Sequence, residues 1–181
     1  PPSLRAAAAR DSFALAAWPY PTTLDAARAF GRDVGAALGK ADRGAAAATA
    51  LQDRLDAVAG AVSGRPPVRA LLLFSLHPLR ACGVGTVHDA LLTLAGGANV
   101  LKADAGPEPT LDRELLRGLA PDVIFLMRPG SVSGQENDEA ASALPDAARV
   151  VRLIDPAVLL PGPTMDTTAV SFAVALHPER A

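Results

Sequence analysis

Beyond residue 65 the chain alternates between short apolar runs and segments with a helical period. The apolar runs at 68–75, 122–127 and 149–154 predict strands, and Leu71-Leu72-Leu73-Phe74 in the first run is apolar on both faces. Such runs are typical of parallel strands covered on both sides. Helices are predicted between and after the strands, at 86–95, 110–119 (with Thr110 as N-cap), 138–144 and 164–176. Strands alternating with helices predict an α/β fold, with a parallel sheet and helices on both faces.

A longer helix is predicted at 41–63. Leu51, Leu55, Val58 and Val62 fall at i, i+4, i+7 and i+11, so they share one face of that helix. At about 1.5 Å per residue the helix would be roughly 33 Å long, which is enough to span a domain.

The first 40 residues are predicted to contain two shorter elements. The apolar run 13–17 predicts a short buried strand, and the two prolines that follow end it because proline cannot donate to a sheet ladder. A helix then runs to about Leu38, with Thr23 as its N-cap and Gly39 as its C-cap.

Composition narrows the possible functions. The 181 residues are 50% hydrophobic and carry a net charge of −2, so a sizeable core is expected and no basic stripe for nucleic acid is indicated. The one cysteine, Cys82, excludes an internal disulfide and a cysteine-based zinc site. No apolar run reaches the roughly 18 residues that a membrane helix needs.

In an open parallel sheet, ligands bind beyond the carboxyl ends of the strands. Three long loops therefore become candidates, at 76–85, 128–134 and 155–163. His77, Arg80 and Arg128 in or beside these loops could contact polar groups of a ligand, with an ordinary surface role as the alternative for each.

The other motifs give weaker indications. Gly83-Val84-Gly85 follows a strand and precedes a helix, but His88 stands where a dinucleotide fingerprint needs its third glycine. We therefore expect these glycines to shape a loop. His88 is expected to be solvated, and His177 to end the last helix, where a cation suits the helix dipole. No spacing favours a Ser-His-Asp arrangement. We predict no catalytic residue, no metal site and no cofactor.

Two stretches resemble a known family. Residues 85–100, which end in Gly96-Gly97-Ala98-Asn99-Val100, are similar to the helix–Gly-Gly–x–Asn segment of helical-backbone (class III) periplasmic substrate-binding proteins. These proteins serve ABC importers of metal chelates: corrinoids, heme and ferric siderophores. Residues 110–116 and Ala120-Pro121-Asp122-Val123-Ile124 resemble a second segment of that family.

The resemblance implies how the chain is divided. Residues 1–40 would be the remnant of a first lobe, 41–64 the interlobe backbone helix, and 65–181 the second lobe, a Rossmann-like α/β unit. The rest of the first lobe, or another chain, would then be a partner.

The resemblance also implies a function, which is to bind a metal chelate without catalysis and deliver it to an ABC permease. The predicted ligand contacts are apolar at Leu79, Leu159 and Leu160 and polar at His77, Arg80 and Arg128. Many members carry an acidic permease-docking residue about where Gly85 stands, and Asp89, one turn further, could replace it. Family members are exported, usually as lipoproteins, so a periplasmic or extracytoplasmic location is expected, with a lipid anchor on the precursor. The alternatives are a stand-alone α/β enzyme or nucleotide-binding domain, and a protein that has kept this fold but lost transport.

Overall fold

The computed structural model describes residues 2–130, 144, 145 and 147–180. The helices are α1 (Pro2–Asp11), α2 (Leu24–Ala37), α3 (Ala41–Val62), α4 (Val87–Leu94), α5 (Arg113–Leu119) and α7 (Met165–Leu176). The strands are β1 (Val68–Leu76), β2 (Leu79–Ala81), β3 (Gly97–Asn99), β4 (Val123–Arg128) and β5 (Arg149–Ile154). Short 3-10 helices lie at Ala103–Ala105 and Pro178–Arg180. The helix predicted at 138–144 lies outside the described residues, apart from Leu144.

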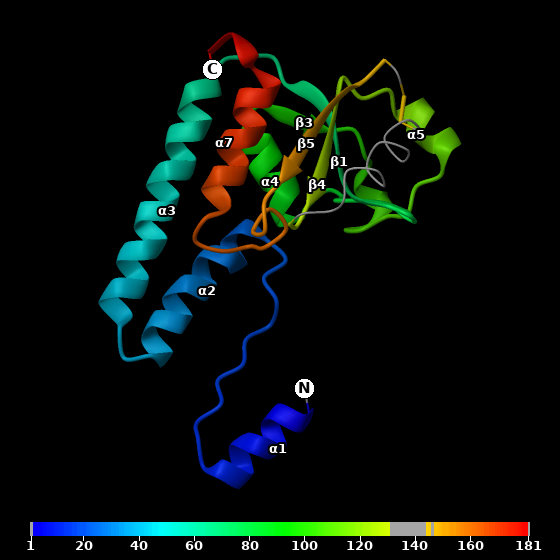
Figure 1. Cartoon of the computed structure of the whole chain (residues 1–181). Helices are drawn as coiled ribbons and strands as arrows, with labels where there is room; N and C mark the ends of the chain where they lie inside the picture. The colour runs from blue at the N-terminus through cyan, green and yellow to red at the C-terminus, as the bar shows by residue number, and fades with distance from the viewer. Residues whose placement is uncertain (1, 131–143, 146, 181) are drawn as a thin grey trace.

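A mostly parallel sheet lies at the centre of the α/β lobe, by which we mean residues 65–180 (Figure 1). Its strand order is β2-β1-β4-β5, and β3 also pairs with β1. β3, β4 and β5 run parallel to their neighbours, whereas β2 turns back antiparallel to β1. The three strands predicted from apolar runs are β1, β4 and β5. The α/β fold with helices on both faces is therefore confirmed.

Each face of the sheet has its own core. Phe125 of β4 and Phe172 of α7 meet on one face with ring centroids 4.6 Å apart, and α3 and α4 complete that layer. On the other face, Leu71 and Leu126 pack with Leu116 of α5. Figure 1 shows the sheet between α3 on one side and α5 on the other.

The long helix α3 packs on the lobe with the face predicted from its sequence. Leu51, Leu55 and Val58 are buried, Val62 is half-buried, and the helix is continuous from Ala41 to Val62. Among the described residues, no helix combines the length and the apolar character needed to cross a membrane.

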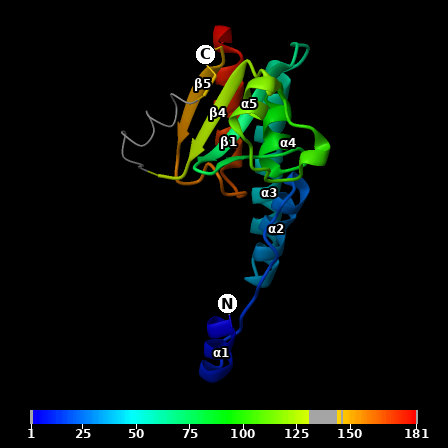
Figure 2. The same cartoon turned by 90° about the vertical axis from the view of Figure 1, so that its right-hand side faces the viewer.

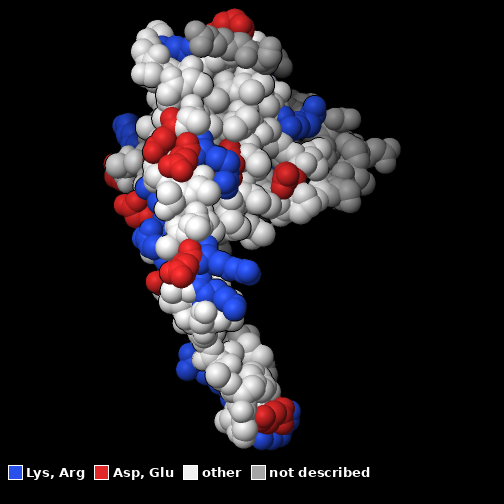
Figure 3. Space-filling view, turned by 90° about the vertical axis from the view of Figure 1, so that its left-hand side faces the viewer, with Lys and Arg blue, Asp and Glu red and all other residues white. Residues whose placement is uncertain are grey.

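α2 and α3 form a tight hairpin. A Cβ on Gly35 would lie 2.6 Å from the Cα of Gly44, so only glycine allows the two backbones to approach this closely. Thr23 caps α2 as predicted, by accepting a hydrogen bond from the Ala26 backbone N–H. Gly39, at a φ of 65°, follows the helix end. Along the face that carries α3, acidic and basic side chains are interspersed (Figure 3).

The prediction of a strand at 13–17 is wrong. Residues 13–22 contain no helix or strand, and the described residues place no neighbouring strand beside them. A strand needs such a neighbour to satisfy its backbone groups. Phe13 is 46% exposed, and α1 stands apart from the lobe in both ribbon views (Figures 1 and 2). Trp18 is held by an edge-on contact with Phe30 of α2.

Two local predictions also need correction. Thr110 does not cap a helix but forms an isolated antiparallel bridge with Arg80. α5 starts later, and the carboxylate of Asp112 caps it by accepting from the Leu115 N–H at 2.7 Å. The segment 76–85, predicted as a loop, contains β2, because it turns at residues 77–78 and pairs back along β1.

Candidate functional site

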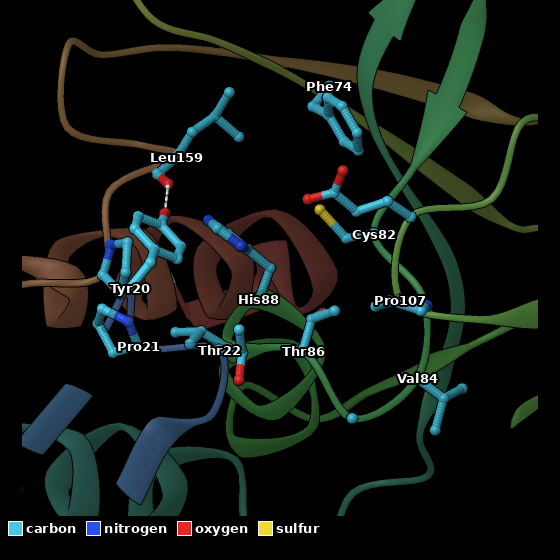
Figure 4. Close-up of a pocket in the computed structure, with 14 residues that line it drawn as sticks. Tyr20, Pro21, Thr22, Phe74, Cys82, Val84, Thr86, His88, Pro107 and Leu159 are labelled. Atoms are coloured by element: carbon cyan, nitrogen blue, oxygen red, sulfur yellow. Dashed lines mark hydrogen bonds between the residues drawn. The ribbon is translucent and has the colours of Figure 1, made fainter. Parts of the chain in front are cut away.

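A pocket of about 570 Å³ opens between the α/β lobe and the segment that leads into α2 (Figure 4). Four stretches of chain and one residue of β1 build its wall. The lining residues are Tyr20, Pro21, Thr22, Phe74, Cys82, Val84, Gly85, Thr86, Val87, His88, Pro107, Glu108, Leu159 and Pro161. The pocket therefore takes residues from both the first 40 residues and the lobe.

Glycine makes one wall of the pocket possible. The Gly83 backbone N–H donates to the Pro107 carbonyl at 2.8 Å, which draws two loops together. A Cβ on Gly83 would lie 1.9 Å from the carbonyl oxygen of Gly106, so a side chain would force the loops apart. These glycines therefore shape a loop, as the sequence predicts.

Asp89, in the first turn of α4, holds the same loop in place through hydrogen bonds. Its Oδ2 accepts from the Gly85 backbone N–H at 2.8 Å, and its Oδ1 accepts from the Asn99 side chain at 3.0 Å. Gly85 itself has a φ of +85°, which favours glycine. Both carboxylate oxygens of Asp89 are thus engaged within the chain.

His88 is not solvated as expected. Its Nε2 lies 2.8 Å from the carbonyl oxygen of Val158, and burial lowers the pKa of the imidazole, only partly offset by this hydrogen bond. The sequence did contain a signal, since His88 lies three and four positions before the buried Leu91 and Leu92, on the same helix face. His88 therefore ties α4 to the loop 155–163.

His177 ends α7 as predicted, and its side chain is buried, with 8% of the residue exposed.

Cys82 lies in the wall as a protonated thiol. Burial, followed by the charges of Glu108 and Asp89, raises its pKa to about 12. Such a thiol is a poor nucleophile at neutral pH, because the thiolate is the reactive form.

The polar rim of the pocket consists of a tyrosine and an ion pair. The Tyr20 hydroxyl donates to the Leu159 carbonyl at 3.2 Å, and partial burial together with Glu108 raises the pKa of this phenol. Arg80 donates to Glu108 Oε2 at 2.7 Å while its guanidinium lies 5.1 Å from the centroid of the Phe74 ring.

The structure brings together only some of the predicted ligand-binding residues. Leu159 lines the pocket, and Arg80 is not among the lining residues but contacts two of them, Glu108 and Phe74. His77 and Leu79 line a separate hollow of about 300 Å³ beside α5. Leu160 is 58% exposed and lies outside the pocket lining.

Arg128 lies at the end of β4 and is half-buried. Its Nε has no hydrogen-bond partner among the described residues. Those residues also include no cluster of three or more potential metal ligands.

The sequence did not identify four of the pocket residues, which are Tyr20, His88, Cys82 and Glu108.

Solved structures with this fold were found, although no family model and no curated protein matches the chain. The periplasmic heme-binding protein RhuT from Roseiflexus sp. RS-1, in its apo form, is 25% identical with a TM-score of 0.79, and the match covers 100% of this chain and 73% of that one. A periplasmic heme-binding protein from Pseudomonas aeruginosa is 22% identical, with a TM-score of 0.80 and coverages of 98% and 68%. The periplasmic vitamin B12 binding protein BtuF of Vibrio cholerae is 20% identical, with a TM-score of 0.71 and coverages of 99% and 71%.

The chain has the fold of periplasmic substrate-binding proteins. This confirms the predicted resemblance to the helical-backbone binding proteins of ABC importers. Between a quarter and a third of each of these neighbours lies outside the match. The neighbours bind heme or vitamin B12, and their names describe binding proteins.

Proposed function

We propose that this chain binds a metal chelate as part of the substrate-binding component of an ABC importer. The observation that carries the proposal is the pocket of about 570 Å³, which is largely apolar and lies on a fold shared with heme-binding and vitamin B12-binding proteins. Small-molecule and cofactor sites are typically pockets of about 300–1,000 Å³ with mainly apolar walls, so this pocket is of the usual size for part of such a site.

The proposed division of the chain fits the composition of the pocket. Residues 1–40 would belong to a first lobe, 41–64 would form the backbone helix, and 65–181 the second lobe. The pocket is lined by residues 20–22 from the first part and by loops of the third. A ligand bound there would contact both parts, with the remainder of the first lobe, or another chain, completing the enclosure.

The pocket residues favour binding over chemistry. The Cys82 thiol is kept protonated and the His88 Nε2 is held by a backbone carbonyl, so neither is prepared as a nucleophile or a proton carrier. Leu159 would contact the hydrocarbon surface of the ligand, as the sequence predicts. A ligand would have to extend beyond the pocket to contact the other predicted residues, which are His77, Leu79, Leu160 and Arg128.

Permease docking through Gly85 and Asp89, at an extracytoplasmic location, is part of the same proposal. Because Asp89 is engaged by Gly85 and Asn99, its removal would disturb the loop as well as the charge. Gly85→Glu is the better probe, and Gly85→Gln is its control, since both impose the same backbone strain and only one adds charge. If Gly85→Glu binds the cognate permease more tightly than Gly85→Gln and the wild type do, the result supports docking at this loop. If the two variants bind equally well, the result contradicts it.

A ligand titration tests the binding function. Hemin, cyanocobalamin and a ferric siderophore are titrated into the chain, with absorbance and melting temperature as readouts. We expect dissociation constants of roughly micromolar or weaker, because between a quarter and a third of each neighbour lies outside the match and this chain alone would enclose less of the ligand.

Leu159→Trp fills the pocket and should abolish the ligand-dependent shift. Leu115→Trp, at an exposed site on α5, is the control for nonspecific adsorption to apolar surface. Binding that both variants retain would place the ligand elsewhere, and sub-micromolar binding by the wild-type chain would contradict the need for a completing partner.

A further inference from the structure

The hydrogen-bond donors of three pocket side chains are already used within the protein. The Tyr20 hydroxyl donates to the Leu159 carbonyl at 3.2 Å, and the Thr86 hydroxyl donates to the Gly83 carbonyl at 2.8 Å. His88 Nε2 lies 2.8 Å from the Val158 carbonyl. A carbonyl oxygen can only accept, so His88 carries its proton on Nε2.

Acceptors remain available on the same wall. Neutral His88 has a bare lone pair on Nδ1, and the Tyr20 oxygen can still accept. Glu108 is the one formally charged residue among those that line the pocket. Arg80 occupies its Oε2, and the described residues supply no partner for its Oε1. The pocket thus offers acceptors and a carboxylate to whatever occupies it.

Two other groups at the pocket could supply donors. Thr22 lines the pocket with a hydroxyl that can donate or accept. The N-terminus of α4 also borders the pocket, and free N–H groups there attract anions. However, Asp89 already places a carboxylate in the first turn of α4, which offsets the positive end of the helix dipole. The charge of Glu108 also raises the pKa of both Tyr20 and Cys82, in keeping with a negative local potential.

We propose that this wall of the pocket selects a chelate whose facing edge carries N–H donors, as carboxamide or ammonium groups, over one that carries carboxylates. Glu108 is the specificity-determining residue. Arg80 is its positioning partner, held between Glu108 and the Phe74 ring. This inference rests on the proposed binding function, because it describes which ligand edge the same pocket accepts. A carboxylate edge would leave the free acceptors unpaired and would lie beside a like charge.

Matched ligand pairs test the inference. Hemin is compared with hemin whose two carboxylates have been converted to primary amides, and cyanocobalamin with a derivative in which a side-chain amide has been hydrolysed to the acid. Metal and ring stay the same within each pair. For the wild-type chain we expect the amide form to bind about tenfold or more tightly, as one hydrogen bond to a charged group provides.

Two variants remove the same charge at different places. Glu108→Gln gives the wall a donor, so the preference for the amide form should fall to near onefold. Glu114→Gln, on the exposed side of α5, should keep the wild-type preference. A wild-type ratio of one or below, or a ratio that Glu108→Gln leaves unchanged, would overturn the inference and leave the binding function standing. If the siderophore binds but no member of either pair does, the inference is overturned and the binding function stands. If neither the pairs nor the siderophore binds, the proposed function fails together with the inference.

Discussion

The run 13–17 and the strand β4 are similarly apolar but have different surroundings. Phe125 in β4 is 0% exposed and has paired strands on both sides, whereas Phe13 is 46% exposed and has no paired strand among the described residues. Apolar composition therefore does not by itself form a strand. The ladder partner and the covering helix are needed as well, and they lie far away in the sequence.

The same contrast sets apart the N-terminal segment, residues 2–22, from the lobe. Trp18 contacts Phe30, Pro21 is buried, and Tyr20 donates to Leu159. Among the described residues, the Tyr20 bond is the one hydrogen bond that joins this segment to the lobe. The candidate pocket thus has one firmly packed wall and one weakly attached wall.

The largest test replaces the same residue type in both regions. Phe125→Ala should lower the free energy of unfolding by about 3–5 kcal/mol, because it leaves a cavity beside Phe172. Phe13→Ala should change it by no more than about 0.5 kcal/mol. Urea denaturation followed by circular dichroism measures both. A comparable loss from Phe13→Ala would mean that the N-terminal segment is packed in solution.

The contrast also explains how much of the fold the sequence could predict. β1, β4 and β5 are long enough for their apolar runs to show, and the apolar face of α3 repeats over about three turns. β2 and β3 have three residues each, too few for a period, and they form because β1 offers them an edge.

The site was less predictable than the fold. Leu159 lies in a loop that follows a parallel strand, a place that topology alone identifies. Tyr20, His88 and Glu108 come from three separate segments that only the tertiary structure brings together. Of these, only His88 had a sequence signal, its position on the buried face of α4.

A smaller effect is expected where α2 attaches the N-terminal segment to α3. Gly35→Ala should destabilise the protein by about 1–3 kcal/mol, because its Cβ would meet the Gly44 backbone. Gly31 lies on the same helix, and a Cβ added there would meet no neighbouring atom within 4 Å. Gly31→Ala should therefore stabilise the protein by about 0.5–1 kcal/mol. Thermal unfolding of both variants checks the pair. Equal effects would show that the close helix crossing does not persist in solution.

The pH dependence of stability tests the contact at the pocket itself. Burial lowers the pKa of folded His88 below its ordinary 6.5, so the unfolded chain takes up the proton first. The resulting contribution to stability is fully present above about pH 6.5 and is lost as the pH falls through the lowered pKa. Urea midpoints between pH 7.5 and 5 should therefore decrease, and His88→Gln should flatten the decrease. A decrease that His88→Gln leaves as steep as in the wild type would contradict this origin of the pH dependence.

The smallest effect belongs to the bond between the two regions. Tyr20→Phe keeps the ring but removes the donor to the Leu159 carbonyl. Because Tyr20 is 64% exposed, water can replace the lost partner, and global stability should fall by no more than about 0.5 kcal/mol. The change should instead appear locally, as amide exchange about two- to threefold faster at Val158 and Leu160, whose N–H groups hold the adjoining turn. Leu15→Ala, in the same segment, should leave these amides unchanged. A loss above about 1.5 kcal/mol for Tyr20→Phe would contradict the contrast, because the N-terminal segment would then unfold together with the lobe.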